Sequence, residues 1–505
     1  MNTLLFNLLT PELILADAAL VVLIAGLIPL TSTHRGMILS LTLLGGLLSG
    51  AWILTHPANY SLFGGMVVLD PLTQLAKVAI LALSLIACIF AYGSTVKEHF
   101  AEYLALILFS TIGMMLLVGT EDLLMIFIGL EMTSIPLYIL TGYLKKSSTS
   151  AEAALKYFMV GGVSAAFLLF GLSLIYGVTG VTSMRELAAI TRTTGADPLL
   201  LAGIVMALAG FGFKVAAVPF HLWAPDVYEG APTSSAALIA SGSKVAGFLI
   251  LAKFLTFGLA KTSGSAAWDL MQAGWLPLLA LIAAASVVIG NLAALSQRNV
   301  KRILAYSAIA QSGYMLLGLT AANANGVASV IFYVIVYALT TLGAFGVVAI
   351  VEQRRGGSDL DHFDGLHRTS PGLALCMGVF MISLAGIPPL AGFFGKFYLF
   401  SGALSSVASA HDGSFGLLWL LIVAIAFNAV SLYYYVIVLK HVFVAPADDA
   451  PAHDPACHCG VSVFVGLLAL AVFALGLYPN ALLNPIQNAI RSAVANPAKA
   501  LVAQP

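Results

Sequence analysis

Charged residues are scarce in this chain of 505 residues, because Asp, Glu, Lys and Arg together make up only 9% of it, and the 22 basic residues equal the 22 acidic ones. Soluble globular domains carry roughly 25% charged residues, so the composition excludes a soluble protein. The even balance of signs also excludes a basic nucleic-acid surface and an acidic disordered tail.

Cysteine is scarce as well, with four residues in the whole chain. Cys88 and Cys376 lie inside apolar runs, so the sequence predicts neither a disulfide framework nor a set of iron–sulfur ligands. A polar loop holds the other candidate ligands, His453, Cys457, His458 and Cys459. Their spacing matches no structural zinc pattern, and we interpret the loop as a solvated segment without a metal.

What the chain has in abundance is apolar residues, at 60% of the total and with a mean hydropathy of +1.00. Recurring apolar runs predict an all-α polytopic membrane protein with about 14 spans. The first run has no basic residue before it and no cleavage site after it, so we expect a retained span. The predicted spans are 11–31, 37–55, 71–93, 101–119, 122–144, 153–177, 198–219, 233–257, 274–296, 302–320, 326–351, 371–402, 415–442 and 461–480. The more polar stretch 480–500 is expected to lie at the membrane interface as a helix.

The basic residues between the predicted spans indicate the orientation. If the N-terminus lies outside, the inner segments contain Arg35, Lys97, Lys145, Lys146, Arg298, Lys301, Arg302, Arg354, Arg355, Arg368 and Lys440. The outer segments then contain only Arg185, Arg192, Lys261, Arg491 and Lys499. By the positive-inside rule, both termini are expected on the outer side.

Six further lysines fall within spans, where a central lysine costs about 2.5 to 3.5 kcal/mol. Lys77 and Lys253 lie near predicted span ends, so we expect their side chains to reach the interface, with Asp70 as a possible partner of Lys77. Lys156 follows Glu152 at i,i+4 on one helix face, which leaves an interfacial and a functional interpretation open.

Lys244 and Glu131 lie deep inside their spans, too far from either surface for the side chain to escape. A carboxylate or an ammonium at that depth must be neutralised or paired. We interpret both residues as functional, with a purely structural buried pair as the alternative.

Two spans carry proline and glycine where a continuous helix would exclude them. The first reads GFGFKVAAVPFHLWAPDVYEGAPT and the second SLAGIPPLAGFFGKFYLFSGAL. Proline removes a backbone donor, and a freed carbonyl at membrane depth must meet protein or water. The sequence therefore predicts discontinuous seventh and twelfth helices, broken at Pro219 and at Pro388 and Pro389, with buried hydration beside Lys214 and Lys396.

The two breaks lie five spans apart, which predicts two five-helix repeats, helices 4–8 and 9–13. An odd number of helices per repeat inverts the second copy in the membrane. The tenth span, RILAYSAIAQSGYMLLGL, has no carboxylate equivalent to Glu131. We divide the chain into helices 1–3 (1–100), the first repeat (101–257), the second repeat (258–442), and an inner loop with helix 14 and the tail (443–505).

Three segments, FKVAAVPFHLWAPDVYEGAPT, RNVKRILAYSAIAQSGYMLLGL and SLAGIPPLAGFFGKFYLF, closely resemble the antiporter-like subunits of respiratory complex I, the proton-translocating NADH:quinone oxidoreductase. The resemblance implies a non-redox subunit in a bacterial plasma membrane, with FMN, iron–sulfur clusters and quinone held by partner subunits. It also implies as neighbours an M-type antiporter-like subunit, small subunits such as K, and the lateral helix of an L-type subunit.

The resemblance assigns roles to individual residues of a proton relay. It places the family's ion-pair carboxylate on Glu131, the helix-seven lysine on Lys214, the central lysine on Lys244, and the helix-twelve residue on Lys396. His221 matches a histidine between the two lysines, although an interfacial ring beside Trp223 is the alternative, and Lys156 matches a secondary lysine. An Mrp-like cation/proton antiporter subunit and a structural scaffold remain the competing functions.

Overall fold

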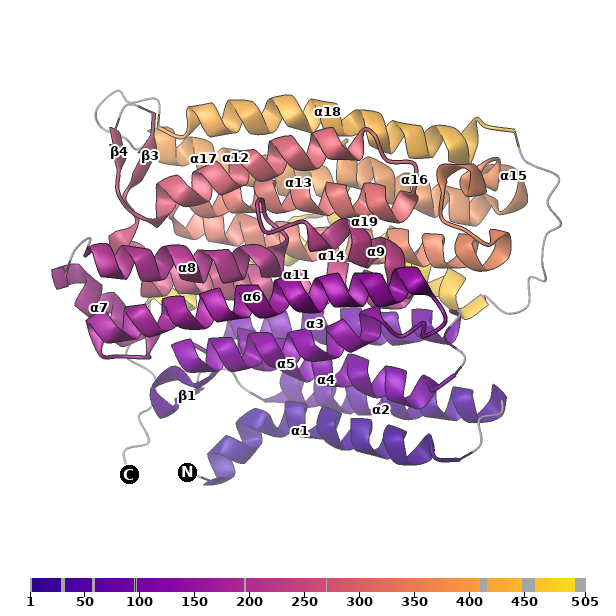
Figure 1. Cartoon of the computed structure of the whole chain (residues 1–505), viewed down its shortest axis with the longest axis horizontal. Coiled ribbons are helices and arrows are strands. Elements are labelled where there is room, and N and C mark those ends of the chain that lie inside the picture. The colour runs from indigo at the N-terminus through magenta and orange to yellow at the C-terminus, as the bar shows by residue number, and fades with distance from the viewer. Residues whose placement is uncertain are drawn as a thin grey trace.

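The computed structural model describes residues 2–28, 32–56, 60–94, 96, 98–194, 197–268, 270–408, 416–446 and 459–495. Within these ranges, 13 helices are long and apolar enough to cross a membrane, and a shorter apolar helix covers Pro371–Ala385. That helix continues across a break into Ala391–Ala408, which supplies the fourteenth span. The prediction of an all-α polytopic membrane protein is therefore confirmed (Figure 1).

The spans follow one another in the predicted order. The first three are α1 (Asn2–Ala25), α2 (Ser32–Thr55) and α3 (Pro71–Tyr92). The first repeat contains α4 (Phe100–Val118), α5 (Leu123–Thr141), α6 (Ser148–Thr179), α8 (Pro198–Val215) with α9 (Trp223–Gly230), and α10 (Thr233–Ala240) with α11 (Gly242–Lys253). The second contains α12 (Trp275–Ala294), α13 (Val300–Thr320), α14 (Ala324–Arg355), α16 (Pro371–Ala385) with α17 (Ala391–Ala408), and α18 (Leu418–Phe443). The chain continues with α19 (Cys459–Leu477) and α20 (Asn480–Ala495).

Short connecting elements mark the two ends of the bundle. Figure 1 places β1 (Tyr60–Leu62), α7 (Met184–Thr194) and the hairpin of β3 (Ser265–Ala267) and β4 (Leu270–Gln272) at one end, which we call the hairpin end. Strand β2 (Val67–Leu69) pairs with β1. Helix α15 (Leu366–Thr369) lies at the opposite end, the α15 end (Figure 1).

The second helix of each repeat begins in the same way. Asp122 caps α5 by accepting hydrogen bonds from the amides of two residues in the first turn, and Asn299 does the same for α13. Each cap residue also forms an isolated antiparallel bridge to a later loop, Asp122 with Ser183 and Asn299 with Asp359. This match aligns α5 with α13, and by the same offset Glu131 aligns with Ala308 and Ser134 with Gln311.

The two helix breaks have the same backbone pattern. The residues that cap the C-terminal ends of α8 and α16, Ala216 and Gly386, are both in the left-handed conformation with positive φ. In each case the cap amide bonds back to the third and fourth preceding carbonyls, and a cis proline, Pro219 or Pro389, follows three residues later. Thus helices 7 and 12 are equivalent, and Leu384 in the second break occupies the position of Lys214 in the first.

Two predictions about lysines near span ends are wrong. Lys77 is 2% exposed and pairs with Glu12 at 2.6 Å instead of with Asp70. Lys253 is 1% exposed and donates to Thr73 Oγ1 at 3.0 Å and to the Val118 carbonyl at 2.9 Å. Neither side chain reaches the interface, because polar partners on neighbouring helices hold it inside the bundle.

Two helices differ in detail from the sequence-based expectation. The eighth span is irregular at Ser241, whose φ and ψ of −111° and −81° separate α10 from α11 three residues before Lys244. Helix α20 packs against α3 and α14 and buries Leu483, Ile486 and Ile490. Its apolar face is therefore covered by protein, and its place at the membrane interface stays a prediction.

Candidate functional site

The first repeat brings Lys214 to α5. Lys214 lies in the last turn of α8, is 4% exposed, and donates to Ser134 Oγ at 3.1 Å. Ser134 stands one helical turn after Glu131, which is half-buried. Among the described side chains, no ion pair within 4.0 Å joins Glu131 to Lys214. The hydroxyl of Ser134 therefore lies beside the ammonium, with the carboxylate one turn away.

Lys244 occupies the centre of the molecule on α11 and is 1% exposed. Its ammonium donates to the Ala308 carbonyl at 2.6 Å and to Ser312 Oγ at 2.7 Å, both on α13. It also lies 5.2 Å from the ring centroid of Tyr337 on α14. A desolvated cation–π contact contributes about 2 kcal/mol, which together with the hydrogen bonds offsets the cost of burying the charge.

Helix α13 connects the two breaks through adjacent residues. Ser312 Oγ donates to the Val215 carbonyl at 2.6 Å, directly beside Lys214 at the first break. Gln311 Nε2 donates to the Leu384 carbonyl at 3.1 Å, at the second break. One turn of α13 therefore contacts both discontinuous helices as well as Lys244.

Lys396 reaches the second break from α17. Its ammonium donates to the carbonyls of Leu384 at 2.7 Å and Ala385 at 3.2 Å, and to Asn428 Oδ1 at 2.6 Å. Gly386 leaves room for the lysine stem, because a Cβ there would lie 2.9 Å from Lys396 Cδ. The Leu384 carbonyl is thus shared by Lys396 and Gln311, which links the distal lysine to α13.

Tyrosines and an asparagine extend this network. Tyr333 donates to Gln311 Oε1 at 2.5 Å, and Tyr435 lies 2.5 Å from Ser307 Oγ and 3.2 Å from Gln311 Nε2. A second group joins Tyr434 and Tyr314 through Asn291. These contacts hold the Gln311 amide in one orientation between α14 and α18.

The Tyr435→Phe substitution is expected to lower the free energy of unfolding by about 1 to 3 kcal/mol, because it leaves buried polar partners on α13 unsatisfied. Thermal denaturation of the purified complex measures the effect. Tyr433→Phe is the matched control, since Tyr433 is 61% exposed on the same helix. Equal melting temperatures for the two variants would show that the Tyr435 hydroxyl does not stabilise the network.

His221 lies in the first break, between α8 and α9, and is 7% exposed. Its Nδ1 has no hydrogen-bond partner among the described protein atoms, and the same holds for the hydroxyl of Tyr228 on α9. Buried polar groups without protein partners are normally satisfied by ordered water. Ordered water at this break would satisfy the ring nitrogen, and the role of His221 in the relay stays a prediction.

Lys156 lies apart from the other predicted relay residues. Its ammonium pairs with Glu152 and with Asp226, each at 2.7 Å, and its side chain is 44% exposed. Asp226 in turn pairs with Arg302 at 2.9 Å, and Arg302 with Glu229 at 2.7 Å. Lys156 therefore belongs to a solvent-accessible ion network that connects α6, α9 and α13.

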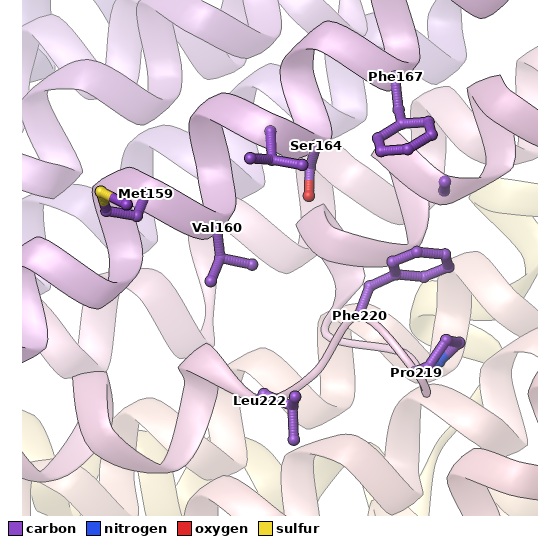
Figure 2. Close-up of a pocket in the computed structure, with 9 residues that line it drawn as sticks. Met159, Val160, Ser164, Phe167, Pro219, Phe220 and Leu222 are labelled. Carbon is purple, nitrogen blue, oxygen red and sulfur yellow. The ribbon is translucent and has the colours of Figure 1, made fainter.

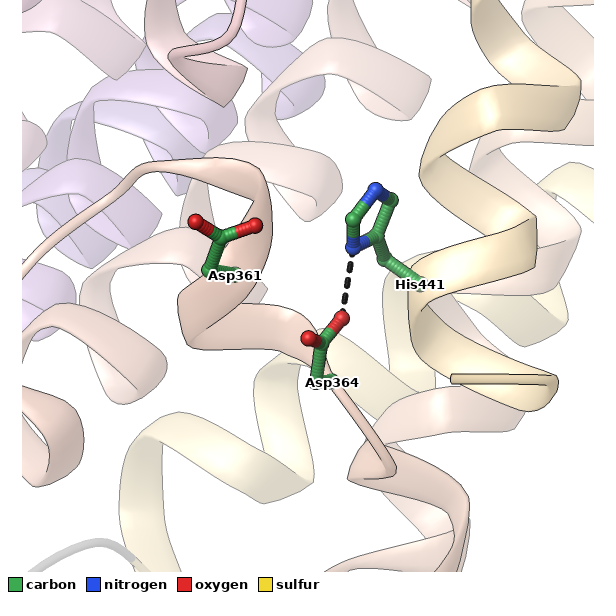
Figure 3. Close-up of side chains that lie close together, drawn as sticks. All are labelled: Asp361, Asp364 and His441. Atoms are coloured by element: carbon green, nitrogen blue, oxygen red, sulfur yellow. Dashed lines mark hydrogen bonds and ion pairs between the residues drawn. The ribbon is translucent and has the colours of Figure 1, made fainter. Parts of the chain in front are cut away.

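One group of possible metal ligands occurs within the described residues, formed by Asp361, Asp364 and His441. Figure 3 shows His441 Nδ1 facing Asp364, and the two atoms are 2.5 Å apart. The group is partly exposed, and the histidine nitrogen is occupied by this ion pair, so we interpret it as a contact between α18 and the loop before α15. The candidate ligands His453, Cys457 and His458 lie outside the described residues.

An apolar groove runs beside the first break. It is lined from α6 by Met159, Val160, Val163, Ser164 and Phe167, from α8 by Ala209, and from the break by Pro219, Phe220 and Leu222 (Figure 2). Met159 and Leu222 are 60% and 71% exposed. The groove therefore presents apolar side chains at membrane depth, directly outside the discontinuous helix.

The charged residues are identifiable from the sequence, but the uncharged ones that join them are not, namely Ser134, Ser312, Gln311, Tyr333 and Asn428. A signal existed for two of them, since Gln311 and Ser312 are adjacent polar residues in an otherwise apolar span. Hydroxyl and amide groups are common in membrane helices, so their identity alone did not set them apart.

Known proteins resemble this chain over most of its length. The family described as "NADH:quinone oxidoreductase/Mrp antiporter, TM" matches residues 120–412. NADH-quinone oxidoreductase subunit N 2 of Acidobacterium capsulatum is 46% identical over 461 residues, covering 89% of this chain and 91% of that protein. Subunit N of Desulforamulus reducens is 37% identical over 492 residues, covering 96% and 98%.

Solved structures share the fold. A chain of respiratory complex I from Thermus thermophilus with bound aureothin has a TM-score of 0.77 and 34% identity, and the match covers 94% of this chain and 98% of that one. A chain of the Mrp complex from Dietzia has a TM-score of 0.80 and 22% identity, with 99% of both chains covered. The fold is common to both assemblies, and sequence identity is higher for the complex I chain.

Proposed function

Because this chain belongs to the antiporter-like membrane subunits of NADH:quinone oxidoreductase, as a subunit of the N type, we propose that Glu131, Lys214, His221, Lys244 and Lys396 form its proton relay. Two sequence features are consistent with the N type: the segment APDVYEGAPT, and the fact that Lys396 is a lysine and not a glutamate. The relay would be driven by redox chemistry in other subunits.

The contact of α13 with both breaks carries this proposal. Ser312 connects Lys244 to the carbonyl beside Lys214, and Gln311 connects to the carbonyl that Lys396 binds. Hydroxyl, amide and backbone groups therefore lie between Lys214 or Lys244 and Lys396. Together with water at the breaks, they would form the path of a released proton. Hydration around His221 would add a group that both donates and accepts near neutral pH.

Glu131 acts in this proposal as the switch. A carboxylate near a buried ammonium stabilises its charged form, and its withdrawal favours release of the proton. Moving one charge through the membrane potential changes the free energy by about 2.3 kcal/mol per 100 mV. A change in the distance between Glu131 and Lys214 is sufficient for such an effect, since Ser134 holds the ammonium without a direct ion pair.

We also propose the placement of the chain in its complex. The α15 end, which carries Arg354, Arg355 and Arg368, would face the cytoplasm of a bacterial plasma membrane, with both termini on the periplasmic side. Neighbours would be an M-type subunit and small subunits such as K, and the lateral helix of an L-type subunit would cover the groove beside α6. FMN, iron–sulfur clusters and quinone would belong to partner subunits. Lys156 would support the relay from the ion network at Asp226.

Glu131→Gln tests the switch because it removes the charge and keeps the shape of the side chain. We expect the rate of proton translocation in proteoliposomes to fall about tenfold, less than the 100-fold or more that loss of a positioned proton-transfer group causes, because Glu131 acts on Lys214 and does not itself carry the proton. The exposed Glu102 on α4, replaced by Gln, is the matched control. Assembly is checked on native gels and by NADH oxidation with an artificial acceptor. Normal translocation by an assembled Glu131→Gln complex would favour the structural scaffold instead.

A further inference from the structure

A second group of buried charges lies at the hairpin end, outside the relay. It contains Glu12 on α1, Lys77 on α3 and Lys253 at the end of α11, which are 4%, 2% and 1% exposed. Lys77 Nζ lies 2.6 Å from Glu12 Oε1, while Glu12 Oε2 is buried without a partner among the described atoms. This is an expensive arrangement for three helices that could pack with apolar side chains.

Both ammonium groups lie at the last turn of α4. Lys253 Nζ donates to the Val118 carbonyl at 2.9 Å. A Cβ on the next residue, Gly119, would lie 3.5 Å from Lys77 Nζ. Thr73 Oγ1 accepts a 3.0 Å hydrogen bond from Lys253 and stands one helical turn before Lys77 on α3. The two lysines therefore share one polar site between α3 and α4.

This site reaches the surface through acidic residues. Asp70, which is half-buried, caps α3 by accepting from the Thr73 amide at 2.6 Å. Burial raises the pKa of Asp70, but the charge of Lys253 and the hydrogen bonds of Thr73 hold that pKa below its usual range. Nearby, Glu121 pairs with Arg185 at 2.8 Å, and the arginine side chain is 40% exposed. The charged group thus ends in contact with solvent at the hairpin end.

A stripe of polar residues leads from this site toward Lys244. Thr73, Lys77 and Ser84 share one face of α3 at the spacing i, i+4, i+11, and all three are buried. The hydroxyl of Ser84 has no partner among the described atoms, and the hydroxyls of Tyr337 and Thr341 lie close to each other on α14, which packs against α3. Lys244 lies over the ring of Tyr337.

Lys244 and Lys253 are so far apart that a proton passing between them needs intermediate groups. Lys244 and Lys253 are nine residues apart on one helix, about 13 Å at the helical rise, and they point to opposite sides of it. Direct transfer between them is excluded. The unpartnered hydroxyl of Ser84 and the hydroxyls of Tyr337 and Thr341 lie on helices that pack against α11, and a buried hydroxyl without a protein partner is normally satisfied by ordered water.

We propose that the α3 stripe and the group of Glu12, Lys77, Lys253 and Asp70 form a second proton-conducting branch between Lys244 and the hairpin end. The proposal rests on the relay function of Lys244. In this branch water at Ser84 passes a proton to the Glu12–Lys77 pair, and Lys253 passes it to Asp70 and solvent. No other ion or co-reactant takes part.

The double substitution Glu12→Leu with Lys77→Met separates conduction from packing. It replaces both charged side chains by apolar ones of similar volume, and such a replacement of a buried ion pair often leaves stability unchanged. We expect the assembled complex to translocate protons about tenfold more slowly in proteoliposomes, a smaller effect than the 100-fold or more expected for loss of a relay group such as Lys244. The exposed pair Lys146 and Glu98, at 3.9 Å, receives the same two substitutions as the control and is expected to leave the rate unchanged.

Ser84→Ala is the second test, because a hydroxyl without a protein partner can be removed without breaking a protein contact. Slower translocation with intact assembly supports the branch. Wild-type rates in assembled Ser84→Ala and Lys253→Met complexes overturn it, even if the double variant fails to assemble. A wild-type rate for a Lys244 variant would instead overturn the relay itself, so the two failures are distinguishable.

Discussion

Replacing Lys244 by Met is expected to reduce proton translocation by about 100-fold, the lower end of the range for loss of one positioned proton donor and acceptor. Lys244 is the only ammonium that α13 holds through both a backbone carbonyl and Ser312 among the described residues. Its removal takes away the ammonium that Ser312 links to the carbonyl beside Lys214. NADH-driven acidification of proteoliposomes measures the rate.

A Lys244→Arg variant gives the sharper comparison. Arginine keeps the positive charge and can donate to the same oxygens, but it does not release a proton in proteins. If Lys244 served only to hold α11 against α13, the arginine variant would translocate protons normally. If Lys244 belongs to the relay, the arginine variant is expected to translocate protons as slowly as the methionine variant. The exposed Lys261, replaced by Met, controls for loss of a lysine near the same span.

Replacing Gly171 by Leu is expected to prevent assembly of the subunit. Gly171 lies where α6 and α8 touch, and a Cβ at this position would be 2.5 Å from the Ala207 amide nitrogen and 2.6 Å from the Gly203 carbonyl oxygen. Small residues allow membrane helices to approach this closely. Leucine would push α8 away from α6 and carry Lys214 away from Ser134, because Lys214 stands at the end of α8.

Gly162 provides the control on the same helix, since nothing lies within 4 Å of a Cβ there and the residue is exposed. Gly162→Leu is expected to assemble and translocate protons as the wild type does. Native gels of solubilised membranes, stained for NADH dehydrogenase activity, give the amount of complete complex. Equal amounts for the two leucine variants would mean that the contact of α6 with α8 is not required for assembly.

The fold was largely predictable from the sequence because lipid imposes simple rules. Apolar length predicts spans, and prolines at membrane depth predict the breaks at Pro219 and Pro389, which the structure confirms. The irregularity at Ser241 was not predicted, because serine and glycine are compatible with continuous membrane helices. Lys77 and Lys253 were misplaced because distance along a helix does not show whether a neighbouring helix offers a polar partner.

The candidate site was also predictable from the sequence only in part. The sequence by itself determined which residues are costly in the membrane, namely Glu131, Lys214, Lys244 and Lys396, because charge at that depth is identifiable from hydropathy alone. Only the tertiary structure decided their connections: Ser312 and Gln311 on α13 meet both breaks, Lys156 belongs to a surface ion network, and Lys77 pairs with Glu12. The physical reason is that desolvation depends on depth along one helix, whereas hydrogen bonds depend on which faces of different helices pack together.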